Sequence, residues 1–104
     1  MQCLHHPKSI RSGGEGKRLM AKDPDLLKHQ ILREMLQGRR KKANLTQRQL
    51  AVLLDKPQSW VCRHERGDLR MDYMELRAYL QALDVSVVSF VSALERKLAK
   101  IDEA

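Results

Sequence analysis

The 104-residue sequence has few aromatic residues, few cysteines and no long apolar run. Aromatic side chains make up only 4% of it, which argues against folds that read single-stranded RNA by stacking bases on sheet-borne rings. The two cysteines, Cys3 and Cys62, are too few to build a disulfide framework. The longest apolar run, residues 51–54, is far shorter than a membrane span, and the first residues offer no apolar stretch suited to a signal peptide. We therefore expect a small cytoplasmic protein.

Positive charge, by contrast, is abundant and unevenly distributed. The chain carries 20 Lys and Arg against 13 Asp and Glu, a net charge of +7. Residues 25–67 contain ten basic and four acidic residues, whereas residues 68–104 contain five and seven. A positive charge gathered in one segment predicts a face that binds a polyanion such as nucleic acid.

The chain divides into a tail and one domain. Residues 1–24 contain prolines, glycines and serines but almost no periodic apolar residues, which predicts a flexible tail. Residues 25–104 have apolar residues at helical spacing and no strand-like alternation, which predicts an all-α domain. Its first helix is expected over residues 25–42, and the basic run at residues 39–42 suits either a solvated helix end or a phosphate contact.

Two short helices with clear boundaries follow. Thr46 and Gln49 are spaced as a capping box at the start of a helix over residues 47–54. Pro57 suits the first turn of a helix over residues 57–66, and Gly67 suits a left-handed cap at its end. A separation of only two or three residues is typical of a helix-turn-helix motif.

Two further helices complete the domain. Asp72 and Glu75 repeat the capping-box spacing, so a fourth helix is expected from about residue 73. Ser86 opens a fifth helix with a long apolar stripe. The stripe consists of Val87, Val91, Leu94, Leu98 and Ile101.

The helix over residues 57–66 has two different sides. Val61 and His64 are three residues apart and are expected to face the core. The other side carries Gln58, Ser59, Cys62, Arg63 and Arg66. Amide, hydroxyl and guanidinium groups suit base edges in the major groove and the flanking phosphates of duplex DNA.

Three segments of the chain carry a family resemblance. They are Leu45-Thr46-Gln47-Arg48-Gln49-Leu50-Ala51, Lys56-Pro57-Gln58-Ser59-Trp60-Val61 and Glu65-Arg66-Gly67. In order and spacing they closely resemble the Xre-like branch of the lambda-repressor-like DNA-binding proteins, over about residues 40–104. The resemblance implies a compact five-helix domain that contains a helix-turn-helix.

The resemblance also implies roles for single residues. Gln58, Ser59 and Arg63 match positions that read bases, and Arg40 matches an arginine that pairs with the residue at Glu65. The resemblance further implies that Gln47 clamps a phosphate and that Arg40 contacts one. Arg48, Lys56 and Arg66 complete the expected phosphate-binding set.

The sequence departs from the family pattern at three positions. Asn44 and Asp55 stand where glycine is usual, and both residue types tolerate the left-handed conformation. His64 stands where an aliphatic residue is common, so packing at this point is expected to differ.

A metal site at Cys62 and His64 and a DNA contact by Trp60 are both less favoured than structural roles for these residues. Cys62 and His64 are two residues apart on a helix and point in different directions, so we expect no metal site. Trp60 is expected to pack against the fourth helix rather than contact the DNA backbone. No catalytic motif or cofactor-binding loop is present in the sequence.

The sequence therefore predicts a regulator that binds double-stranded DNA sequence-specifically, acts as a repressor, and is not an enzyme. The alternative is an antitoxin or another interaction module whose main partner is a protein such as a toxin. The basic helix over residues 57–66 favours DNA.

A lone recognition helix reads too few base pairs to select one operator, which favours a homodimer on a pseudo-palindromic site. The expected dimer interface is the end of the fifth-helix stripe: Val91, Leu94, Leu98 and Ile101. The alternative is that the last turns fold back along the first helix and bury Leu26 or Leu27.

Overall fold

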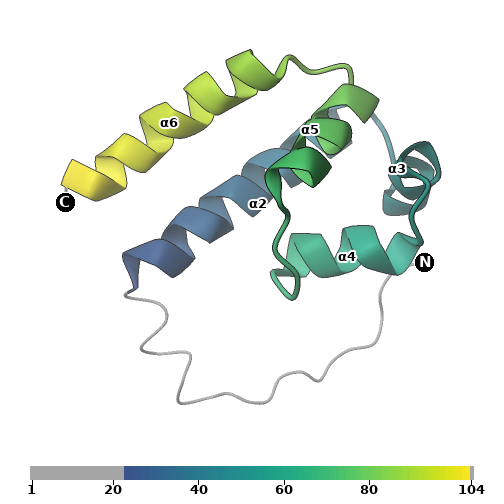
Figure 1. The fold of residues 1–104 in the computed structure, drawn as a ribbon, viewed down its shortest axis with the longest axis horizontal. Coiled ribbons are helices and arrows are strands. Elements are labelled where there is room, and N and C mark those ends of the chain that lie inside the picture. Colours follow the sequence, from purple (N-terminus) through teal and green to yellow (C-terminus); the bar gives the residue numbers. More distant parts are fainter. Residues whose placement is uncertain (1–22, 104) are drawn as a thin grey trace.

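The computed structural model describes residues 23–103, and this part of the chain consists of helices and connecting turns without a strand (Figure 1). The helices are α2 (Pro24–Lys42), α3 (Gln47–Leu54), α4 (Gln58–Arg66), α5 (Tyr73–Ala82) and α6 (Val87–Glu103). The predicted all-α class and the helix-turn-helix spacing of α3 and α4 are confirmed.

Helix α2 begins one residue earlier than predicted. The Asp23 side chain caps it by accepting a hydrogen bond from the Asp25 backbone N–H at 2.9 Å, and Pro24 occupies the first turn. Pro24 was assigned to the tail, but its fixed φ and missing N–H suit the start of a helix. The rest of the predicted tail, residues 1–22, lies outside the described residues.

Local signals set the ends of α3 and α4. Thr46 Oγ1 accepts from the Gln49 backbone at 3.0 Å, and Gln49 Oε1 accepts from the Thr46 backbone at 2.8 Å, which completes the predicted capping box. Asp55 adopts the left-handed conformation, with φ of 57°. Pro57 lies just outside α4 in an extended conformation, with ψ of 154°, and not in its first turn as predicted.

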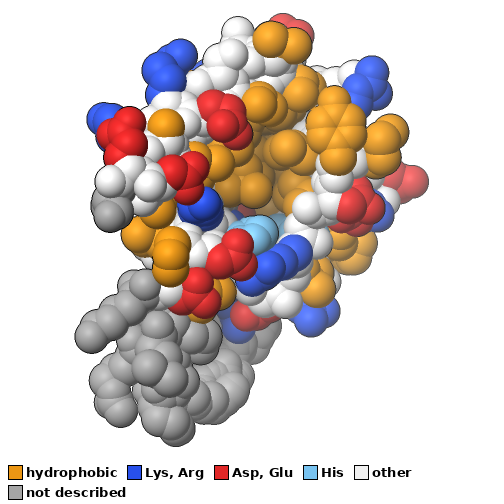
Figure 2. Space-filling model, turned by 60° about the vertical axis from the view of Figure 1, so that its left-hand side comes forward, with side chains coloured by type: hydrophobic (Ala, Val, Ile, Leu, Met, Phe, Trp, Pro, Cys, Tyr) orange, Lys and Arg blue, Asp and Glu red, His pale blue; other side chains and the backbone are white. Residues whose placement is uncertain are grey.

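All five helices contribute to one core, whose most deeply buried side chains are Leu50, Val61, Tyr79, Leu80 and Phe90. The Tyr79 hydroxyl donates a hydrogen bond to the Leu36 carbonyl at 3.3 Å, which links α5 to α2. On one face, apolar side chains gather in a hollow with charged groups around it (Figure 2).

Helix α6 lies alongside α2 and runs in the opposite direction (Figure 1). An ion pair of 2.6 Å between Lys28 Nζ and Asp102 joins the start of α2 to the end of α6. Leu94 was predicted in the dimer interface, but it is only 8% exposed and belongs to the core, so a second copy cannot contact it. Val91 and Leu98 are partly buried against the same core, and Ile101 is half-buried.

The end of α6 therefore folds back along α2, as in the alternative expected from the sequence, but it does not fully bury Leu26 or Leu27. Leu27 remains 40% exposed, and Leu26 is half-buried.

Across residues 23–103, no single helix has the length and apolar character to cross a membrane. Only α5 and α6 taken together, at a bend of 115°, meet both criteria.

Candidate nucleic-acid interface

Helix α4 packs against α3 and exposes one side. Ser59, Arg63 and Arg66 are exposed, and Gln58 is half-buried, whereas Val61 and His64 are buried as predicted. The exposed side thus carries a hydroxyl and two guanidiniums next to an amide, a set of groups able to donate to and accept from base edges.

Cys62 corrects the sequence assignment of this helix. It was placed on the outward side, but it is 2% exposed. Unlike its neighbour Val61, it does not belong to the hydrophobic core cluster.

The predicted pair between α2 and α4 is present. Arg40 Nε donates to Glu65 Oε2 at 2.7 Å, and a second nitrogen donates to Glu65 Oε1 at 3.2 Å. The third guanidinium nitrogen donates to the Leu45 carbonyl at 2.7 Å. Arg40 is 7% exposed, so the structure assigns its guanidinium to this pair, and a phosphate contact would require it to leave Glu65.

Glu65 also accepts hydrogen bonds from two glutamines. Gln37 Nε2 and Gln47 Nε2 lie 3.2 and 2.9 Å from Glu65 Oε1. Gln58 Nε2 in turn donates to Gln47 Oε1 at 3.4 Å. The sequence predicted separate roles for Gln47 and Gln58 and did not single out Gln37. The hydrogen bonds that connect these glutamines to Glu65 join side chains from three helices, so no local sequence pattern could predict them.

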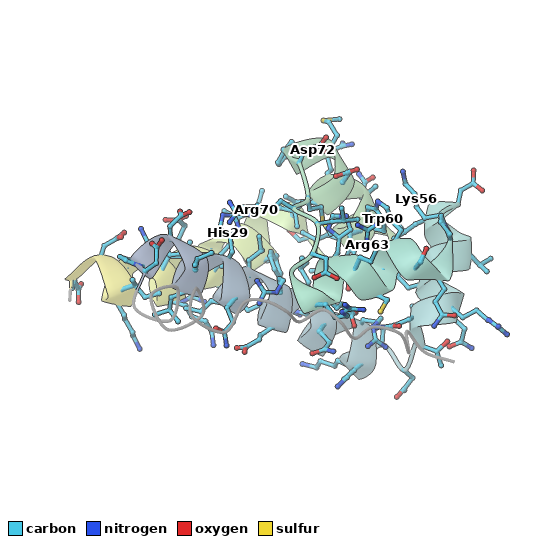
Figure 3. The ribbon with its side chains drawn as sticks, turned by 90° about the horizontal axis from the view of Figure 1, so that it is seen from below. His29, Lys56, Trp60, Arg63, Arg70 and Asp72 are labelled. Atoms are coloured by element: carbon cyan, nitrogen blue, oxygen red, sulfur yellow. The ribbon has the colours of Figure 1, made fainter. Side chains whose placement is uncertain are left out.

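The other predicted phosphate-binding residues lie on α3, in the turn before α4 and at the end of α4. Arg48 and Lys56 are exposed, and the Arg66 guanidinium forms an ion pair of 3.0 Å with Asp68. Lys56 Nζ lies 5.3 Å from the centre of the Trp60 ring, within range of a cation–π interaction. Lys56 in the turn before α4 is followed by Trp60 and Arg63 on the helix (Figure 3).

Trp60 and His64 anchor α4 to α5 and the loop before it. Trp60 is partly buried against the core, and it lines one pocket together with Met74 and Ala78 of α5. Its ring centre is 4.2 Å from that of His64. Burial lowers the pKa of His64, and the negative charge of Glu75 and a hydrogen bond with the Leu69 backbone only partly oppose this effect. His64 is therefore held in its neutral form at neutral pH.

Among residues 23–103, no three His, Cys, Asp or Glu side chains are grouped so as to hold a metal ion. Burial also raises the pKa of Tyr79, which keeps this phenol protonated.

Comparison with known proteins agrees with this geometry. The helix-turn-helix domain family matches residues 31–89, more than half of the chain. The fold is similar to that of an XRE-family like protein from Pseudomonas syringae pv. tomato str. DC3000, with a TM-score of 0.66 and 25% sequence identity over 81% of this chain and 98% of that one. No curated protein matches the chain. The chain belongs to the helix-turn-helix domain family as an XRE-like member, and thus to a class of DNA-binding regulators.

Proposed function

We propose that this protein is a transcriptional repressor that recognises a specific double-stranded DNA sequence with α4. The observation that carries the proposal is the exposed side of α4, where Ser59 and Arg63 lie beside Gln58. In this proposal these three residues contact base edges in the major groove. The basic surface makes a protein partner the weaker alternative.

The phosphate contacts come from the residues around that side. Gln47 stands at the start of α3, where backbone N–H groups also favour an anion. Arg48 and Lys56 are exposed and able to reach the sugar-phosphate backbone. Arg66 joins them from the end of α4.

We further propose that the protein binds DNA in the cytoplasm as a homodimer. A second copy doubles the number of base pairs that are read, and this is needed to select one operator among many competing sites. Of the predicted interface, Val91, Leu98 and Ile101 remain only partly covered within one chain. Sedimentation with and without operator DNA tests this part, and a single copy on each operator would reject it.

Selection of bound sequences from a random DNA pool tests the main proposal. The expected outcome is a pseudo-palindrome with half-sites about one helical turn apart. Recovery of unrelated sequences would reject specific recognition.

Salt dependence tests the electrostatic part separately. Three exposed or partly exposed cations per copy, Arg48, Lys56 and Arg66, give six phosphate contacts for a dimer. The log–log slope of affinity against salt is then about −5. A slope near zero would contradict the assigned phosphate contacts.

A further inference from the structure

A cavity lies between α2, the end of α4 and the loop that leads to α5. Its volume is about 70 Å³, and its walls are largely apolar, with Leu26 and Leu32 on α2 and Leu69 and Met71 in the loop. Since one water needs roughly 10–15 Å³ on the same measure, this space admits several waters or a molecule with a few heavy atoms. The cavity is partly open to solvent.

The polar groups of the cavity are mostly cationic or donors. Arg33 of α2 and Arg70 of the loop both line it, together with His29 and His64. His29 and Arg70 lie next to each other where α2 meets the loop (Figure 3). The space-filling view shows a histidine with both basic and acidic groups at the edge of the apolar hollow (Figure 2). This arrangement favours a ligand with an anionic end.

Arg33 is the group in this cavity that lacks compensation. Its Nε is buried and has no hydrogen-bond partner among the described residues. The ion pairs formed within residues 23–103 do not include it. Glu65 also lines the cavity but already accepts hydrogen bonds from Arg40 and two glutamines, so it does not neutralise Arg33. A buried donor without a partner is costly and favours a ligand that supplies an acceptor.

We propose that this cavity binds a small carboxylate with a short apolar chain, such as one of two or three carbons. The carboxylate accepts hydrogen bonds from the Arg33 guanidinium, whose planar fork matches a carboxylate in two-point contact. The chain of the ligand lies against Leu32 and Leu69. The two histidines and Arg70 surround the charged end.

The cavity adjoins the end of α4. His64 and Glu65 form part of its wall, and a Cβ placed on Gly67 would lie only 2.9 Å from Arg33 Cζ. A ligand that draws the guanidinium inward therefore changes the contact between α2 and the end of α4. If α4 reads DNA, as proposed above, the carboxylate also acts as an effector of DNA binding; this last step alone depends on the proposed function.

The simplest competing explanation is that Arg33 only stabilises the end of α4. A guanidinium near a helix C-terminus interacts favourably with the partial negative charge there. This explanation accounts for the position of Arg33 over Gly67 but predicts no affinity for carboxylates. The two interpretations thus differ in a measurement on the free protein.

The test is a titration of the DNA-free protein with sodium propionate at pH 7, followed by NMR. We expect saturable shifts of the Gly67 and Leu69 amides and of the Arg33 Nε–H. Propionamide and sodium chloride are the controls, because they match the shape or the ionic strength but supply no carboxylate. R33Q should weaken propionate binding at least tenfold, whereas R96Q, which changes an exposed arginine on α6, should not.

If propionate gives no saturable shifts even at concentrations well above millimolar, the proposal is overturned. Equal binding of propionamide would also overturn it. Unchanged binding by R33Q would also overturn it, and its circular dichroism checks that this variant is folded. A second titration measures operator affinity with and without propionate. Carboxylate binding without an effect on DNA would leave the site standing and reject only its role as an effector.

Discussion

Arg33 and Arg40 lie about two turns apart on α2 and face the same neighbour, α4, yet their surroundings differ. Arg40 is almost fully buried, and all three of its guanidinium nitrogens donate to protein acceptors. Arg33 is half-buried, and its Nε has no acceptor among the described residues. One end of the α2–α4 contact is closed by an ion pair, and the other is open at a cavity.

The difference shows how a small domain can combine rigidity with a site for a ligand. Glu65 draws Arg40, Gln37 and Gln47 together, so the start of α3 and the end of α4 are held by one carboxylate. Such a network holds the exposed side of α4 in a fixed orientation. Arg33 Nε has no such acceptor among the described residues, so the contact between α2 and the end of α4 can change when a ligand supplies one.

The largest expected effect comes from removing Glu65. E65A leaves the buried Arg40 charge without its partner, and we expect a loss of about 3–5 kcal/mol in the free energy of unfolding. The double variant R40M/E65A should be less destabilised than E65A. Chemical denaturation measures both, and additive effects in this double-mutant cycle would show that the pair is not coupled. R33M provides the matched contrast, because an unpaired arginine should be replaced at little cost.

Arg63 should affect binding rather than folding. R63A is expected to weaken binding to the selected operator by about 1–3 kcal/mol and to relax specificity at one or two base pairs. Fluorescence anisotropy on operator and random DNA measures both effects. R96A removes an exposed arginine from α6 and is the control. An equal loss on both DNAs would assign Arg63 to phosphate binding instead.

Gly67 tests the contact at the open end. It has a φ of 89°, and an added Cβ would press on the Arg33 guanidinium, so G67A should cost about 1–2 kcal/mol in stability. G38A is the matched control, because Gly38 lies within α2 with no atom near an added Cβ and should stabilise by roughly 0.5–1 kcal/mol. Thermal unfolding compares the two. A G67A variant as stable as the wild type would mean that this end of the contact is looser than described.

The smallest effect concerns pH. Burial lowers the pKa of His64 below its ordinary value of 6.5, so below that value the unfolded chain takes up a proton more readily than the folded one. Stability should therefore be complete above about pH 6.5 and decline as the pH falls toward the lowered pKa. The positive charges of Lys56 and Arg63 add to this effect, and Glu75 opposes it. H64Q should flatten the decline between pH 7 and pH 5 in thermal unfolding, and an unchanged decline would show that other groups cause it.

The sequence by itself determined the local features of this protein. Capping boxes, the left-handed residues Asn44 and Asp55 and the cap at Gly67 depend on neighbours within a few positions, and the structure has all of them. The spacing of α3 and α4 followed from their caps, and the pair of Arg40 with Glu65 from the family resemblance. The exposed positions of Ser59 and Arg63 followed from the helical period.

Only the tertiary structure decided which faces are covered. Leu94 is buried because α6 lies along α2, and Cys62 is buried although it is not part of the core cluster. Pro24 was predicted in the tail and Pro57 in the first turn of a helix, but Pro24 begins α2 and Pro57 lies just outside α4. The hydrogen bonds from Gln37 and Gln47 to Glu65 and the cavity at Arg33 join residues far apart in the chain. Periodicity determines which residues share a face, but only the packing of helices determines what that face contacts.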